Sequence, residues 1–157
     1  MRYWLFPVLV LILFSACSRD TAYKYFTKLD SRHERAVTQL RRITLKEGER
    51  TEALISIIYL NPVDPELYRR QHFFFVALYD KRGTGLDAYR ITLNGKVAAG
   101  VAQLDDDCDL RSLMPLNNPW NAYYEVVFDG VKDDGNITLR FETDPSLQGE
   151  VTYDTDQ

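Results

Sequence analysis

The sequence predicts a mainly β protein: an antiparallel β-sandwich with an immunoglobulin-like layout, preceded by one amphipathic helix. Three observations support this fold class. After Gly48, short apolar or alternating segments follow one another, turn residues separate them, and no helical pattern comes between them. A parallel α/β sheet is therefore not expected. A small closed β-barrel is the alternative, since strand number and alternation do not decide whether a sheet closes.

Residues 21–42 form the predicted helix, because they contain neither Gly nor Pro. Side chains suited to one buried helix face recur at spacings of three and four, namely Ala22, Phe26, Leu29, His33, Ala36, Leu40 and Ile43. Ser31 followed by Glu34 also fits a capping box, which would begin a shorter helix at that point.

Residues 43–157 are predicted to form the sandwich. Residues 52–60 and 72–79 are almost continuously apolar, which is typical of central strands covered on both faces. Elsewhere apolar and polar residues alternate, and pairs such as Asn94-Gly95 give turn signals between the segments. The further predicted strands cover residues 89–93, 96–104, 124–128 and 137–142 and a last segment that holds Val151 and Tyr153.

Charge is distributed unevenly along the chain. The formal net charge is -4, yet residues 18–46 hold eight bases against three acids, and residues 47–157 hold ten bases against twenty acids. This acidity argues against a nucleic-acid partner. The basic segment either docks on the acidic body or faces an anionic surface. We expect one helix flank to face phospholipid headgroups, the flank formed by Lys24, Lys28, Arg32, Arg35 and Arg42.

The pattern of the N-terminus predicts an export signal. The apolar stretch from Tyr3 to Phe14 is shorter than the ~20 residues that a membrane-spanning helix needs, but it fits a signal-peptide core. It ends in the run Leu13-Phe14-Ser15-Ala16-Cys17, which resembles the lipobox of bacterial lipoproteins. A secretory signal followed by a chance cysteine is the alternative.

This resemblance implies that residues 1–16 are removed and that Cys17 carries a diacylglyceryl group and an N-terminal acyl chain such as palmitate. Residues 17–20 would then be a short tether. Ser18 after the anchor implies the outer membrane of a Gram-negative bacterium, periplasmic side, with the inner membrane and the cell surface as alternatives. The domain itself resembles small envelope lipoproteins of unknown function.

The sequence contains few residues that could support catalysis. The chain offers only His33 and His72 as neutral-pH bases, and both fall in apolar patterns, so we expect structural roles for them. There is no nucleophile elbow, zinc-protease motif or phosphate-binding glycine loop. We therefore expect a protein that is not an enzyme and has no cofactor. Cys108 is expected to be a free thiol, because the only other cysteine would be lipidated.

Acidic residues cluster at one place. Asp105, Asp107 and Asp109 match the first three ligand positions of an EF-hand loop. However, Leu110 replaces the required Gly and Leu116 replaces the closing Glu, so an EF-hand is rejected and no metal is assigned. An irregular calcium site stays open as an alternative to a solvated loop.

The segment 117–124 is the candidate contact surface, because Trp120 and Tyr123 lie beside amide side chains. The alternative is a loop whose Trp closes the end of the sandwich. The sequence thus predicts an interaction or assembly module that contacts another envelope protein. A carrier of a small apolar ligand is the second hypothesis, and it requires a cavity lined by residues such as Phe73, Phe75 and Tyr124.

Overall fold

The computed structural model describes residues 31–115, 118–144 and 147–156. The predicted signal peptide, Cys17 with its tether, and residues 21–30 of the predicted helix lie outside the described residues, as do the bases Lys24 and Lys28. Within the described part of the chain, no helix combines the length and the apolar character that crossing a membrane would require.

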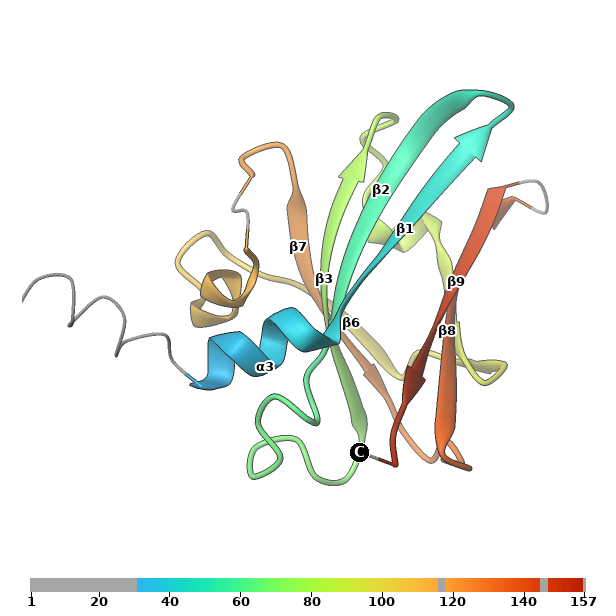
Figure 1. Cartoon of the computed structure of the whole chain (residues 1–157). Coiled ribbons are helices and arrows are strands. Elements are labelled where there is room, and N and C mark those ends of the chain that lie inside the picture. The colour runs from blue at the N-terminus through green and yellow to red at the C-terminus, as the bar shows by residue number, and fades with distance from the viewer. Residues whose placement is uncertain (1–30, 116–117, 145–146, 157) are drawn as a thin grey trace, which may run out of the picture. The chain divides into compact units, whose positions relative to one another are not determined.

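Two antiparallel sheets face each other, and they do not join into a closed barrel (Figure 1). One has five strands in the order β1-β2-β3-β7-β6, and the other has four in the order β5-β4-β8-β9. The predicted β-sandwich is therefore confirmed. The strands are β1 Leu40–Glu47, β2 Arg50–Tyr59, β3 His72–Asp80, β4 Arg90–Leu93, β5 Lys96–Val97, β6 Gly100–Gln103, β7 Ala122–Phe128, β8 Asn136–Asp144 and β9 Leu147–Asp154.

The helix boundary differs from the prediction. In the described residues the helix α3 covers Ser31–Gln39, and strand β1 follows directly. The predicted end at Arg42 is wrong, because Leu40 already pairs with Ile58 of β2. From there the chain alternates between the two faces of the sheet, so that Ile43 is buried on the inner face.

The predicted strand 96–104 is two strands. Asn94 and Gly95 have φ angles of 47° and 82° and form the predicted hairpin turn from β4 into β5. The chain then leaves this sheet between β5 and β6, and β6 pairs with β7 in the other sheet. One short segment therefore links the two layers of the sandwich.

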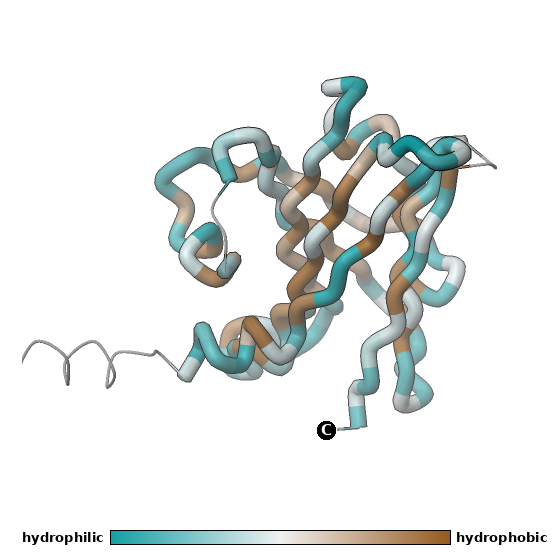
Figure 2. The backbone as a smooth tube through the Cα atoms, turned by 45° about the horizontal axis from the view of Figure 1, so that its top comes forward, coloured by the Kyte–Doolittle hydropathy of each residue, from teal (hydrophilic) through white to brown (hydrophobic). Residues whose placement is uncertain are grey.

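Apolar side chains form two clusters, one on each face of the five-stranded sheet. The inner cluster fills the space between the sheets with side chains such as Phe74, Phe128 and Phe141, each fully buried. The outer cluster lies under α3 and the short helix η2 (Asp109–Leu113) and includes Phe75. In Figure 2 the hydrophobic colour follows the central strands. Strands β2 and β3 are thus buried on both faces along much of their length, as predicted.

Candidate functional site

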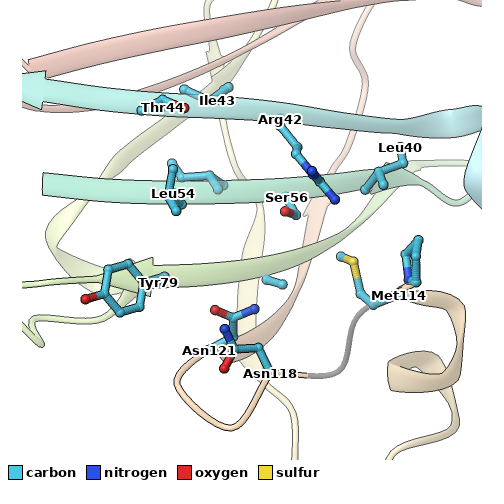
Figure 3. Close-up of a pocket in the computed structure, with 13 residues that line it drawn as sticks. Leu40, Arg42, Ile43, Thr44, Leu54, Ser56, Tyr79, Met114, Asn118 and Asn121 are labelled. Atoms are coloured by element: carbon cyan, nitrogen blue, oxygen red, sulfur yellow. The ribbon is translucent and has the colours of Figure 1, made fainter. Parts of the chain in front are cut away.

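A groove of about 500 Å³ lies on the outer face of the five-stranded sheet. The α3 and η2 layer covers only part of this face, and the groove opens beside it over β1, β2 and β3 (Figure 3). Its size is within the range of ligand and peptide pockets. The lining residues are Leu40, Arg42, Ile43, Thr44, Leu54, Ile55, Ser56, Ala77, Tyr79, Met114, Pro115, Asn118 and Asn121.

The strand register explains how residues far apart in the sequence form the floor of the groove. Residues paired across antiparallel strands point to the same face, so each set of partners gives a row of neighbouring side chains. The first row contains Arg42, Ser56 and Ala77, and the second contains Thr44, Leu54 and Tyr79. Neighbours such as Ile43 and Ile55 point inward and are buried in the core.

The surface is hollow here because the centre of the first row holds small side chains. Ser56 and Ala77 lie between Arg42 and the connection from η2 to β7. In the second row, Leu54 and Tyr79 are 45% and 37% exposed, although most other residues of their strands are buried. The groove therefore combines a shallow centre with exposed apolar surface on its floor.

A hydrogen-bonded turn carries Trp120 between Asn118 and Asn121, two residues that line the groove. The Asn118 side-chain oxygen accepts a hydrogen bond from the Trp120 amide at 3.0 Å, and the Asn118 carbonyl accepts one from the Asn121 amide at 3.1 Å. The Tyr123 hydroxyl oxygen accepts a further bond from the Asn118 amide at 3.0 Å. Trp120 is 77% exposed, so the alternative in which it closes the end of the sandwich is wrong.

Tyr123 lies elsewhere than the sequence analysis expected. Its side chain is 2% exposed and stacks on Phe75, with ring centroids 5.9 Å apart. The Arg111 guanidinium lies 4.3 Å from the centre of the Tyr123 ring. Tyr123 therefore holds the turn that carries Trp120 and presents no surface of its own to a partner. Of the two residues proposed for contact, only Trp120 is accessible.

The described bases of the predicted helix flank, Arg32, Arg35 and Arg42, do not share one surface. Arg32 lies 3.8 Å from the Asp64 carboxylate, and the Arg35 guanidinium donates a hydrogen bond to the Val63 carbonyl at 2.9 Å. Both side chains thus dock on the domain. Arg42 belongs to β1 and lies in the groove, where its side chain extends toward Ser56 (Figure 3).

Arg42 is the one charged side chain among the described residues that line the groove. It is exposed, and within residues 31–115, 118–144 and 147–156 it has no hydrogen-bond or ion-pair partner. By contrast, the surface residue Arg140 pairs with Glu150 at 2.7 Å. The groove thus presents an uncompensated positive charge on a protein that is acidic overall.

Both histidines take part in hydrogen bonds that hold the fold. His33 Nδ1 donates to the Ser112 carbonyl at 3.2 Å, which ties α3 to η2. The Tyr59 hydroxyl and His72 Nδ1 are 2.8 Å apart and share a hydrogen bond. Burial lowers the pKa of His72, with the Asp133 carboxylate acting in the opposite direction, so the imidazole is neutral at pH 7.

The acidic run does not converge on one point. The Asp106 carboxylate pairs with Arg111. Among the described residues, no three His, Cys, Asp or Glu side chains are placed to hold a metal ion. Cys108, a free cysteine within this part of the chain, packs half-buried against the outer cluster.

The residues suggested for a ligand cavity lie on opposite faces of one sheet. Phe73 and Phe75 belong to the outer cluster, whereas Tyr124 belongs to the inner cluster. They therefore do not line a common space.

No family model, curated protein or solved structure matches this chain. Function is accordingly inferred from the chain's own residues. Sequence reasoning singled out the segment 117–124, which contains Asn118 and Asn121 of the groove. It missed the strand residues of the groove, because only the strand register makes Arg42, Ser56 and Ala77 neighbours.

Proposed function

We propose that this protein is a lipoprotein of the bacterial envelope, anchored through acyl chains on Cys17 at the periplasmic side of the outer membrane. It acts as a non-enzymatic interaction module that binds another envelope protein through the groove and the neighbouring Trp120. The observation that carries the proposal is Trp120, 77% exposed on a turn fixed by hydrogen bonds beside a groove of about 500 Å³.

The composition of this surface supports protein contact. Trp, Tyr and Arg are the residue types that contribute most at protein interfaces, and they do so from the centre of a contact where water is excluded. Arg42 and Tyr79 line the groove, and Trp120 is exposed in the turn whose residues Asn118 and Asn121 also line it. Exposing a Trp side chain to water costs free energy that burial in an interface recovers, at roughly 25 cal/mol per Å².

The lipid anchor supplies the membrane affinity in this proposal. Each buried methylene contributes ~0.8 kcal/mol, whereas a basic side chain near an anionic surface adds only ~1 kcal/mol. Because Arg32 and Arg35 dock on the domain, few bases of the described helix are available for lipid headgroups. The acyl chains therefore hold the protein, and the domain is left to contact proteins.

Photo-crosslinking in living cells tests the proposal. We would place p-benzoylphenylalanine at Trp120 and, as a matched control, at Val97, which is 54% exposed on strand β5 of the other sheet. We expect a discrete crosslink from position 120 and none from position 97. The partner identified by mass spectrometry should then bind the purified full chain at least tenfold more weakly after Trp120→Ala.

A second arm tests the anchor. Cys17→Ser should move the protein from the membrane fraction to the soluble periplasmic fraction. Unchanged fractionation with no incorporated lipid would contradict the anchor, and equal crosslinking from both positions would contradict the contact surface.

A further inference from the structure

The groove has a charge pattern that restricts its occupant. Its described lining contains one cation, Arg42, and no acid, although the protein as a whole has a formal net charge of -4. Within the described residues this guanidinium has no hydrogen-bond or ion-pair partner. A guanidinium binds a carboxylate through two parallel hydrogen bonds, and such a pair is stronger than a neutral hydrogen bond. The complementary group on the occupant is therefore an anion, and on an unmodified protein segment that anion is a carboxylate.

Next to this charge the floor is apolar. Leu54 and Tyr79 are neighbours in the second row, and both are partly exposed. Thr44 completes this row on the β1 side. An aliphatic or aromatic side chain of an occupant, packed against Leu54 and Tyr79, would remove apolar surface of both residues and of the occupant from water. The occupant thus presents an acidic group and an apolar group to adjacent rows.

The separation of the rows fits an extended peptide. Arg42 and Thr44 are two positions apart on β1, and two positions along a strand correspond to roughly 6.6 Å. Side chains i and i+2 of an extended segment point to the same side and have the same spacing. A segment lying along the strands therefore places residue i on the first row and residue i+2 on the second.

The walls of the groove favour a peptide over an anionic lipid. A carrier site for a small amphiphile buries most of its ligand. This groove is open on one side and has polar groups on Ser56, Asn118 and Asn121. The Asn121 side chain, which has no hydrogen bond to the described residues, is available for a peptide backbone.

We infer that the groove binds an extended protein segment that carries Asp or Glu two positions from an apolar residue, with the carboxylate on Arg42 and the apolar side chain packed against Leu54 and Tyr79. This inference rests on the proposed function, since it specifies what the partner contributes to the same surface.

A phage-displayed library of linear octapeptides, selected on the full chain purified in detergent, provides the probes. We expect selected peptides to contain Asp or Glu at position i and an apolar residue at i+2. The best peptide and its Glu→Gln or Asp→Asn counterpart are then compared by fluorescence anisotropy. Arg42→Gln should weaken binding of the acidic peptide at least tenfold and leave binding of the amide counterpart unchanged.

Matched variants separate charge from shape. Arg90→Gln removes the same charge from an exposed position on β4 of the other sheet and should not change peptide binding. Ser56→Leu fills the centre of the groove without changing charge and should abolish binding of both peptides. Arg42→Glu should reverse the preference, so that a Lys counterpart binds better than the acidic peptide.

Several results would overturn the inference: selection without enrichment of acidic residues, equal effects of Arg42→Gln and Arg90→Gln, or Arg42-dependent binding of laurate with no bound peptide. Failure of the proposed function is distinguishable from these. If the crosslinked partner binds Arg42→Gln as well as it binds the unaltered chain, only the acidic segment is refuted. If position 120 yields no crosslinked partner, the proposed function itself fails.

Discussion

Substitution of Gly149 tests the contact between the edge strands β1 and β9 of the two sheets. Gly149 lies on β9, where it pairs with Phe141 of β8, and a side chain at this position would point toward β1. A Cβ added at Gly149 would lie 2.3 Å from Ile43 Cγ2 and 2.9 Å from Leu45 Cδ2. Both side chains are buried, at 5% and 1% exposure, and in a close-packed interior such groups can shift only if their neighbours also move. Gly149→Ala should therefore strain the contact between β1 and β9.

Two opposing effects determine the change in the free energy of unfolding. Replacing Gly by Ala in a strand ordinarily stabilises by roughly 0.5–1 kcal/mol, because the unfolded chain loses freedom. Overpacking a filled core costs roughly 1–3 kcal/mol. The contact distance of 2.3 Å to a buried branched side chain places Gly149→Ala in the upper part of this range. The net expectation is a loss of about 1–2 kcal/mol.

Urea unfolding of the full chain, followed by far-ultraviolet circular dichroism of the β-sheets, measures this loss. Gly100→Ala is the matched control, since no atom lies within 4 Å of the added Cβ and the residue is on an exposed edge strand. It should leave stability unchanged or slightly raised. In a double-mutant cycle, Ile43→Ala removes the clashing Cγ2, so Gly149→Ala should cost less in that background. A Gly149→Ala variant as stable as Gly100→Ala would refute this reasoning.

Two further predictions concern strand β7. Tyr123→Phe removes the hydroxyl that binds Asn118, so we expect the free energy of unfolding to fall by about 1 kcal/mol. The turn that carries Trp120 should then be less well held, and partner binding should weaken. Unchanged partner affinity would show that this hydroxyl does not position Trp120. Burial raises the pKa of Glu125, because the charged carboxylate is disfavoured in the folded protein. Relative to the unfolded chain, the protonated form stabilises the fold below pH 4.5, and this contribution is lost as the pH rises through the raised pKa. The stability gained by Glu125→Gln should grow from pH 4 to pH 7 in urea titrations, and a gain independent of pH would contradict this assignment.

The sequence was sufficient for the fold class because strand patterns depend on local alternation. The sequence did not predict the boundary between the helix and the first strand, because a helical and a strand pattern overlap there. Leu40 and Ile43 fit a helical spacing, whereas Ile43 and Leu45 fit the alternation of a strand. Pairing with β2 resolves this overlap in favour of β1, and pairing is a contact between distant residues. The change of sheet between β5 and β6 has no local signal for the same reason.

The candidate site was predictable only in part. An exposed Trp in a turn rich in Asn and Pro was found from composition, but Tyr123, three residues later, is buried because strand β7 begins at Ala122. Leu54 and Tyr79 were assigned to buried strands, and their partial exposure depends on how far the η2 layer extends over the sheet. No pattern within one strand contains that information.

Strand β1 contributes residues both to the contact with Gly149 and to the groove. Its inward residues Ile43 and Leu45 contact the position of Gly149, and its outward residue Arg42 belongs to the groove. The continuous pairing of β1 with β2 keeps Arg42 beside Ser56 even where β1 and β9 are forced apart. Strain introduced at Gly149 should therefore lower the free energy of unfolding without lowering peptide affinity in the folded protein. On the proposed binding mode, opposite faces of β1 carry stability and recognition, so each should be alterable without the other.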